Sequence, residues 1–274
     1  PRTRIIWGIR GSAMDLKHYD PTRRLIFMAE RWLSRHADLI VANSTAGRDH
    51  VRANGFPGRL LRVVSNGIDT ARFRRDETAC DETARDAVRD NWGVGPADCL
   101  IGLVGRLDPK KDHETFLRAA ALLLETNERV RFVCIGSDGL SKQQKLQDLA
   151  HELGLTDHLI WAGHRSDLPV VLNALDIHCS ASAFGEGFSN AVAESMATGL
   201  PNAVTDVGDA AKIVGGLGEV VPPRNPMRLA AAWRALAALD PTSRSRRRAD
   251  CKARISDNFS RALMIERMDN LYGE

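Results

Sequence analysis

Apolar residues occur in short continuous runs that alternate with stretches of helical spacing along nearly the whole chain. Continuous runs are typical of parallel strands that are buried on both faces of a sheet. The predicted strands are Arg4–Ile9, Leu39–Ala42, Leu61–Val64, Leu100–Val104, Val130–Ile135, Leu159–Ala162, Ile177–Cys179, Ala203–Val204 and Glu219–Val221. Between them apolar residues recur three and four positions apart, as at Phe116, Ala120 and Leu124, which predicts helices. This alternation predicts an α/β protein with parallel sheets and right-handed crossovers.

The predicted elements fall into two blocks that are separated by a polar stretch. Residues 1–70 contain three strands and form a first block, which is expected to be incomplete because three parallel strands bury little surface. Residues 71–96 are interpreted as a linker with an entry helix. Residues 97–240 contain six strands, enough for a complete doubly wound domain. Residues 241–274 are expected to be helical, and the last helix, Phe259–Tyr272, is expected to cross back to the first block.

Composition and charge narrow the possible classes of function. The chain has 274 residues, of which 43% are hydrophobic and 27% charged, which is typical of a globular protein. Its net charge of +3 argues against general nucleic-acid binding by bulk charge. No apolar run approaches the roughly 18 residues that a membrane span needs. The five cysteines lie far apart and lack the spacing of a zinc site, which favours a reducing, cytoplasmic location.

The strongest chemical signal is the sequence Gly-Glu-Gly-Phe-Ser-Asn at Gly185–Asn190, which follows a predicted strand and opens a helix. Small residues before a helix let a ligand approach the free N–H groups of its first turn, which favour anions. Glu186 in the loop and Glu194 inside the helix are expected to lie at the same edge of a cleft. Two carboxylates beside an anion site suit a nucleotide or a sugar nucleotide. The alternative is a surface loop followed by an ordinary solvated glutamate.

A second signal is Val104–Asp112, where a predicted strand ends and a loop begins. Arg106 and Lys111 are expected to project from this loop at the carboxyl edge of the sheet, where open α/β sheets bind ligands. Two cations at that edge suit a diphosphate. The arginine can bind two phosphate oxygens at once, and the lysine ammonium acts as a compact positive charge. The alternative is two solvent-facing bases in a turn.

The motifs together resemble a known family. Their order and spacing are similar to those of the retaining glycosyltransferases of family 4 (group 1), which have the GT-B fold of two Rossmann-like domains. The stretches that carry the resemblance are Ser65–Asp69, Val104–Asp112, Gly185–Asn190, Glu194–Pro201 and Thr205–Gly208. The resemblance covers nearly the whole chain, with the N-terminal domain incomplete.

The resemblance implies a role for each matching residue. Arg106 and Lys111 would hold the donor diphosphate and stabilise the departing nucleotide, Glu194 would bind the ribose hydroxyls, and Glu186 would lie by the donor sugar. Backbone N–H groups would contact the sugar and phosphate in the run formed by Gly187, Phe188, Ser189 and Asn190.

Further donor contacts are implied at neighbouring loops. Gly105 would line the donor site, and the loop around His164 and Arg165 would meet the nucleobase mainly through backbone atoms. The Gly136–Gly139 turn would border the same cleft. The resemblance implies no metal and no cofactor, because Arg and Lys compensate the charge of a UDP- or GDP-linked donor and no Asp-x-Asp pair occurs.

Three residues depart from the family pattern. Ser189 stands where relatives often carry proline, and Asn202 stands where an apolar strand residue is usual. Arg10 stands where many relatives place a histidine close to the donor sugar. A guanidinium can contact a sugar or a phosphate, but it cannot act as a base at neutral pH.

The remaining histidines and strand cysteines receive structural interpretations. His113, His151 and His178 lack partners at the spacing of a metal site, so they are interpreted as structural or solvated. Cys134 and Cys179 are interpreted as small core residues.

The function implied is transfer of a sugar, with retention, from a nucleotide-diphosphate-sugar to a hydroxyl of a saccharide or lipid-linked acceptor, in cell-surface polysaccharide or glycolipid assembly. Whether this chain is active alone is left open. The alternatives are a non-catalytic nucleotide-sugar-binding module and a sugar-nucleotide epimerase of GT-B-like fold. The basic amphipathic helix Arg23–Arg35 indicates either contact with an anionic membrane, at the inner face of the plasma membrane, or packing on its own sheet with a solvated basic face.

Overall fold

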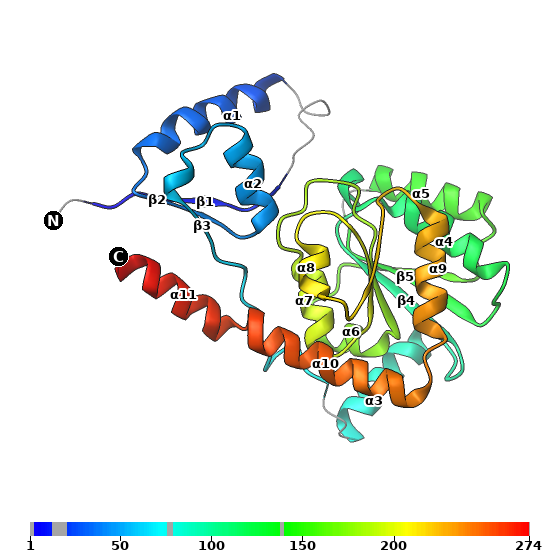
Figure 1. The fold of residues 1–274 in the computed structure, drawn as a ribbon. Helices are drawn as coiled ribbons and strands as arrows, with labels where there is room; N and C mark the ends of the chain where they lie inside the picture. The colour runs from blue at the N-terminus through cyan, green and yellow to red at the C-terminus, as the bar shows by residue number, and fades with distance from the viewer. Residues whose placement is uncertain (1–2, 13–20, 76–78, 138–139, 274) are drawn as a thin grey trace.

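The protein contains two separate parallel sheets that are connected by helices (Figure 1). The computed structural model describes residues 3–12, 21–75, 79–137 and 140–273. The smaller sheet has the order β1-β2-β3, and its strands are β1 (Ile6–Ile9), β2 (Leu39–Ala42) and β3 (Leu61–Val63). Its helices are α1 (Pro21–Leu33) and α2 (Thr45–Ala53), with short 3₁₀ turns η2 (Ser34–His36) and η3 (Gly58–Leu60). A small core around Ile40, Val51 and Phe56 holds this block together.

The larger sheet has six strands in the order β6-β5-β4-β7-β8-β9. All pairs of neighbouring strands in this sheet are parallel. The chain adds β5 and β6 on one side of β4 and then returns to add β7, β8 and β9 on the other side. This is the strand order of a doubly wound fold, with its topological switch point beside β4. The strands are β4 (Cys99–Val104), β5 (Val130–Ile135), β6 (Leu159–Gly163), β7 (Ile177–Ser180), β8 (Asn202–Thr205) and β9 (Glu219–Val221).

Helices cover both faces of the larger sheet. The helices are α3 (Ala79–Asn91), α4 (His113–Leu124), α5 (Leu140–Glu152), α6 (Leu168–Ala174), α7 (Asn190–Ala197), α8 (Ala210–Val214) and α9 (Pro226–Ala237), with a 3₁₀ turn, η4 (Pro109–Lys111). Strand β4 shows why its apolar run is continuous: Ile101 and Leu103 belong to one core, with Trp233, and Leu100 belongs to the core of the other face. Both faces of each central strand are therefore apolar.

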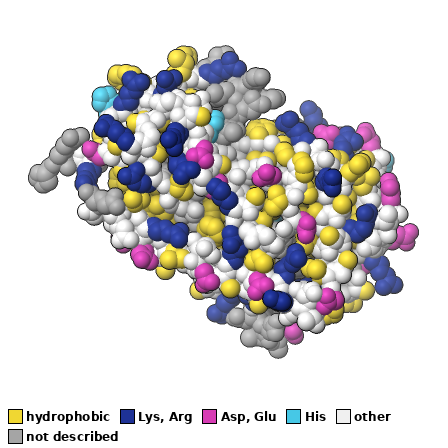
Figure 2. Space-filling view, in the orientation of Figure 1, with side chains coloured by type: hydrophobic (Ala, Val, Ile, Leu, Met, Phe, Trp, Pro, Cys, Tyr) yellow, Lys and Arg dark blue, Asp and Glu magenta, His cyan; other side chains and the backbone are white. Residues whose placement is uncertain are grey.

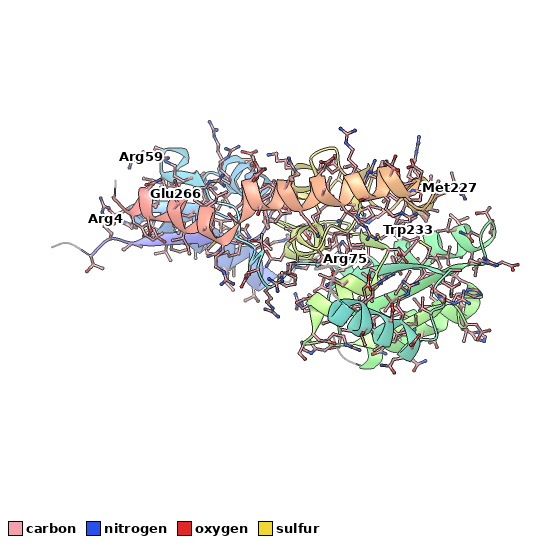
Figure 3. All side chains as sticks on the ribbon, turned by 90° about the horizontal axis from the view of Figure 1, so that it is seen from below. Arg4, Arg59, Arg75, Met227, Trp233 and Glu266 are labelled. Atoms are coloured by element: carbon pink, nitrogen blue, oxygen red, sulfur yellow. The ribbon has the colours of Figure 1, made fainter. Side chains whose placement is uncertain are left out.

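Two C-terminal helices connect the larger sheet to the smaller one. Helix α10 (Pro241–Phe259) contacts α7. Helix α11 (Arg261–Gly273) continues to the block of the smaller sheet, where Arg4 Nη1 donates to Tyr272 O at 3.1 Å. Figure 3 shows the two helices following one another along the molecule, with Arg4 and Glu266 at the same end. Between the helices the backbone pairs with Ile68, whose N–H donates to Phe259 O at 2.8 Å and whose carbonyl accepts from Arg261 N at 2.9 Å. The last helix therefore begins at Arg261, two residues after the predicted start.

The predicted strands all form, with ends that differ by one or two residues. Strand β1 begins at Ile6, later than predicted, and Ile5 and Ile6 are 49% and 43% exposed at the open edge of the smaller sheet. The α/β class with parallel sheets is confirmed. Across the described residues, no helix combines the length and the apolar character needed to cross a membrane.

Candidate functional site

Two loops meet at the carboxyl end of the neighbouring strands β4 and β7. The loop after β4 carries Lys111, and the loop after β7 carries Glu186. Their side chains form an ion pair, with Lys111 Nζ 2.6 Å from Glu186 Oε1, and both are largely shielded from solvent. Ser182 Oγ donates to the same carboxylate oxygen at 3.0 Å. The structure therefore brings together two of the predicted site residues as partners of each other, an arrangement that sequence spacing did not predict.

Gly105 and Arg106 directly follow β4, in the loop that carries Lys111. The Arg106 side chain is 64% exposed and lies 3.8 Å from Asp108 Oδ2, so its guanidinium is available to a ligand in solution. Gly105 N donates to Ile135 O at 2.9 Å, and the Lys111 side chain passes close to the Gly105 Cα. Gly136 has a φ of +135°. A Cβ at this position would clash with the carbonyl oxygen of Gly105. The rest of the predicted border turn, residues 138–139, lies outside the described residues.

Glu194 sits one turn inside α7 and is partly buried. Burial raises the pKa of its carboxyl, while the positive charge of Arg72 acts in the opposite direction. A partly desolvated carboxylate accepts hydrogen bonds from hydroxyl groups readily, because little water competes for it. The contact of Glu194 with ribose hydroxyls stays a prediction.

The residues just before α7 form a tightly packed turn. Phe188 is buried and packs against Phe259 of α10 at a ring distance of 5.4 Å, so its side chain belongs to the core. Ser189 is the N-cap residue, yet its side chain makes no cap hydrogen bond, and its buried Oγ has no partner among the described atoms. The first-turn N–H groups of α7 are therefore not capped by the Ser189 side chain.

A polar chain links the smaller sheet to the start of α7. Arg10, which follows β1, donates from Nη1 to Asn66 Oδ1 at 3.3 Å. Asn66 in turn donates from Nδ2 to Asn190 Oδ1 at 2.8 Å. The structure thus links Arg10 to the N-terminus of α7 through Asn66, and its contact with the donor stays a prediction. Asn66 was not predicted, although it lies inside the Ser65–Asp69 motif.

Arg165 lies apart from this cluster. It follows β6, which is two strands away from β4, and its guanidinium pairs with Asp167 at 2.7 and 2.5 Å. The hydrogen bond from Arg165 lowers the pKa of the Asp167 carboxyl. The guanidinium also lies over the Trp92 ring. The Arg165 side chain is therefore already paired, and contact of this loop with a nucleobase stays a prediction.

The core contains Asn202, the histidines His113 and His178, and the cysteines Cys134 and Cys179, whereas His151 is exposed on α5. Asn202 Oδ1 pairs with His178 Nδ1 at 2.6 Å and accepts from Ser195 Oγ at 2.9 Å, all in the buried interior. This network explains why a polar residue occupies position 202. Burial lowers the pKa of His178 and of His113 to about 4. Burial also raises the pKa of the Cys134 and Cys179 thiols.

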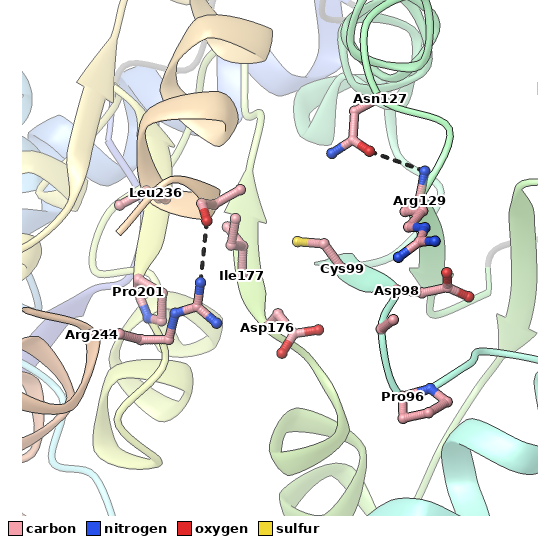
Figure 4. Close-up of a pocket in the computed structure, with 12 residues that line it drawn as sticks. Pro96, Asp98, Cys99, Asn127, Arg129, Asp176, Ile177, Pro201, Leu236 and Arg244 are labelled. Carbon is pink, nitrogen blue, oxygen red and sulfur yellow. Dashed lines mark hydrogen bonds between the residues drawn. The ribbon is translucent and has the colours of Figure 1, made fainter. Parts of the chain in front are cut away.

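A separate cavity of about 360 Å³ lies at the opposite end of the strands (Figure 4). It is lined by residues at the amino ends of β4 and β7, among them Cys99 and Asp176, and by Arg129 and Arg244. Ligands of open parallel sheets bind at the carboxyl ends, so this cavity is not the candidate site. In the part of the chain that the structure describes, no group of His, Cys, Asp and Glu has the arrangement of a metal site.

Two family models match the chain, one over each sheet. The pattern described as "Glycosyl transferases group 1" matches residues 98–238, just over half of the chain, and the pattern "Glycosyltransferase Family 4" matches residues 2–72. The chain belongs to the group 1 glycosyltransferases. The match covers the larger sheet together with Arg106, Lys111, Glu186 and Glu194, so the site described above lies inside the region that defines the family.

Two curated relatives illustrate the relationship. EpsD of Bacillus subtilis is 28% identical over 185 residues, which cover 66% of this chain and 46% of EpsD. The lipopolysaccharide core biosynthesis mannosyltransferase LpsB of Rhizobium meliloti is 29% identical over 189 residues, which cover 68% of this chain and 50% of LpsB. The matched part of the chain thus corresponds to half or less of each of these relatives.

A solved structure confirms the architecture. Alr3699/HepE of Anabaena, in complex with UDP and glucose, has a TM-score of 0.87 and 21% sequence identity, over 99% of this chain and 72% of HepE. The predicted GT-B type of fold, with two Rossmann-like parallel sheets, is therefore confirmed.

Proposed function

We propose that this chain contains the donor site of a glycosyltransferase that moves a sugar from a nucleotide-diphosphate-sugar to a hydroxyl group, with retention of configuration. The observation that carries the proposal is the ion pair between Lys111 and Glu186, which joins the loops after the neighbouring strands β4 and β7 just before the start of α7. This place is the switch point of the sheet, where doubly wound folds bind nucleotides. Membership of the group 1 glycosyltransferases supports the proposal.

The proposed chemistry is mainly electrostatic. When the bond between the sugar and the diphosphate breaks, negative charge builds on the diphosphate. In this proposal Lys111, the exposed Arg106 and the N–H groups at the start of α7 would stabilise this charge. The acceptor hydroxyl would attack from the same face of the sugar that the leaving group occupies. This route requires no metal or cofactor.

Glu186 is assigned to positioning and contact with the sugar rather than to nucleophilic attack. An ammonium group has three donors, so Lys111 can keep its bond to Glu186 and still bind a phosphate oxygen. The same ion pair, together with the hydrogen bond from Ser182, draws electron density away from the Glu186 carboxylate. These contacts support the proposed front-face mechanism over a double displacement with Glu186 as the nucleophile.

UDP is the proposed nucleotide, with GDP as the alternative. HepE, which has the same fold, is solved with UDP and with UDP-glucose. LpsB is a mannosyltransferase of lipopolysaccharide core biosynthesis, and EpsD is a further relative. The names of these relatives support a saccharide or lipid-linked acceptor and a pathway of cell-surface polysaccharide or glycolipid synthesis.

Contact with an anionic membrane at the inner face of the plasma membrane is proposed for α1. The apolar side chains Leu25, Ile26, Met28 and Trp32 of this helix are 53–66% exposed. Arg24, Arg31 and Arg35 are also exposed, and Figure 2 shows Lys and Arg side chains gathered over this block. An exposed apolar face flanked by arginines suits the surface of an anionic bilayer and a lipid-linked acceptor.

The test of the activity is nucleotide release. The protein is incubated with UDP- and GDP-sugars and with a mixture of saccharide and lipid-linked acceptors, and free nucleotide and products are measured. A transferase releases nucleotide and forms a glycoside whose anomeric configuration matches that of the donor. An epimerase would change the sugar without forming a glycoside, and a non-catalytic module would bind nucleotide with no product. Lys111→Ala should abolish release, and Lys212→Ala, at an exposed lysine of α8, should not.

A further inference from the structure

A buried carboxylate joins the two sheets beside the loop at residues 185–189, which we name the donor loop. Asp209 precedes α8 of the larger sheet and is only 5% exposed. Its Oδ2 accepts from Thr45 N at 2.7 Å and its Oδ1 from Ala46 N at 2.9 Å. Both donors belong to the first turn of α2, which packs on the smaller sheet. Asp209 therefore caps a helix of the other sheet.

The cap completes the N-terminus of α2. Within the same turn, Gly47 N donates to the Ser44 side chain at 3.0 Å, so the first three N–H groups of α2 all have an acceptor. A negative charge at this end is favoured by the helix dipole, and N–H groups that lose a partner in a buried place are costly. The contact with Asp209 is thus favourable only while the two sheets are held together.

The turn that carries Asp209 also holds the donor loop. Asp209 N donates to Gly187 O at 3.0 Å. Gly208 in this turn has a φ of +66°. A Cβ at Gly208 would lie 2.5 Å from Glu186 O and 2.6 Å from Gly187 O, so the turn is in direct contact with the loop.

The smaller sheet approaches the same loop from the other side. The hydroxyl of Ser12 donates to Glu186 O, and a Cβ at Gly187 would lie 2.8 Å from Asn43 Oδ1. The donor loop is thus enclosed between the Asp209 turn and the segment that leads into α2.

We propose that Asp209 is a positioning residue, a latch that holds the start of α2 against the larger sheet and thereby fixes the donor loop. The assignment of this loop to the donor rests on the proposed function, whereas the latch itself rests only on the contacts between the sheets. Opening of the cleft breaks both bonds to Asp209 and frees Gly187 and Glu186 to move. Closing it restores the geometry in which Glu186 meets Lys111.

The chain offers a variant that removes one latch bond without touching Asp209. Thr45 is the first residue of α2, a position where proline is favoured. A proline at this position carries no backbone N–H group. Ser44 has φ −153° and ψ 154°, which is a conformation that a residue before proline adopts. Thr45→Pro should therefore keep the helix and delete the bond. Thr45→Ala is the matched control, because it removes the side chain and keeps the N–H group.

The experiment is hydrogen exchange by mass spectrometry on the 274-residue chain without ligand, read at a peptide that contains residues 185–189. We expect Thr45→Pro and Asp209→Asn to speed exchange there by roughly tenfold, the factor that loss of one charge-assisted hydrogen bond predicts. Thr45→Ala should match the wild type. Asp206→Asn, at an exposed position of the same turn, should also match it.

The proposal is overturned if exchange of the donor loop is the same in Thr45→Pro and Thr45→Ala. It is also overturned if exchange rises equally in the distant strand β5 of Thr45→Pro and Asp209→Asn, because that pattern means general unfolding. Neither result depends on a nucleotide. Failure of the latch is therefore distinguishable from failure of the proposed function, which would show as absence of nucleotide binding by the wild type.

Discussion

Lys111 and Glu186 show how a single contact organises the candidate site. The two side chains come from different loops and neutralise each other in a place where both are mostly removed from water. A buried charge without its partner is strongly unfavourable, so each residue fixes the rotamer of the other. Under the proposed function, the ion pair would hold Lys111 in place for the donor diphosphate before any ligand binds.

The buried histidines make stability depend on pH. Burial lowers the pKa of His178 and His113 from 6.5 to about 4, so the folded protein binds fewer protons than the unfolded chain between these values. The free energy of unfolding should therefore be highest above pH 7 and fall as the pH drops through this range. The expected loss at pH 5 is about 2 kcal/mol for each histidine. Urea unfolding at pH 7.5 and pH 5 measures it.

His178→Leu separates this effect from general acid sensitivity. The variant removes one titrating group, so the loss of stability between the two pH values should shrink by about half. His151→Gln, at an exposed histidine of α5, should leave the loss unchanged. An unchanged pH dependence in His178→Leu would show that this histidine is not held neutral by the core.

Residue motifs predicted one part of the site and missed another. Arg106, Lys111, Glu186 and Glu194 were identified because they stand in short motifs next to strand ends. Asp209 was missed because its partners, Thr45 and Ala46, are more than 160 positions away in the chain. A carboxylate that caps a helix of another sheet leaves no local pattern, so only the three-dimensional arrangement reveals it.

At the scale of elements, hydrophobic periodicity predicted the strands well. The runs are continuous because helices cover both faces of the larger sheet, and this burial is a strong local signal. The break between α10 and α11 was not predicted, because it is set by the pairing of Ser260 and its neighbours with Ile68. Tertiary pairing of this kind overrides the helical preference of a short segment.

The turn after β5 offers a test of how the loops of the site support each other. A Cβ at Gly136 would collide with the carbonyl oxygen of Gly105, so Gly136→Ala should displace the loop that carries Arg106 and Lys111. We expect UDP affinity to fall by about tenfold or more, a cost of about 1.4 kcal/mol. Gly154→Ala is the control, because Gly154 also has a positive φ but no atom within 4 Å of an added Cβ. Equal UDP affinities in the two variants would contradict this role of Gly136.

The exposed face of α1 is tested with lipid vesicles. The double variant Leu25→Gln, Met28→Gln removes two side chains that are 66% and 64% exposed, so folding should be unaffected. We expect about tenfold weaker binding to vesicles that contain phosphatidylglycerol, and little binding of either protein to neutral vesicles. Sedimentation with vesicles measures the binding. Met227→Gln, at an exposed methionine of α9, is the control, and equal binding of all three proteins would contradict the membrane proposal.

At the scale of the whole molecule, the site depends on how the two sheets are joined. The Asp209 contacts and the chain from Arg10 through Asn66 to Asn190 connect the sheets at the cleft. The pairing of Ile68 between α10 and α11 connects them away from it. The donor loop after β7 is therefore held by contacts that come from both sheets.

The measurement that tests the central claim most directly is calorimetric titration of the chain with UDP, GDP and ADP, each without added metal. We predict that UDP binds, and that Lys111→Ala and Glu194→Ala each weaken its binding by about tenfold or more, the cost of losing a hydrogen bond to a charged group. Both variants should unfold at the temperature of the wild type within a few degrees. Absence of binding by all three nucleotides, or equal UDP affinity in the wild type and both variants, would contradict the assignment of this cleft as a nucleotide-sugar site.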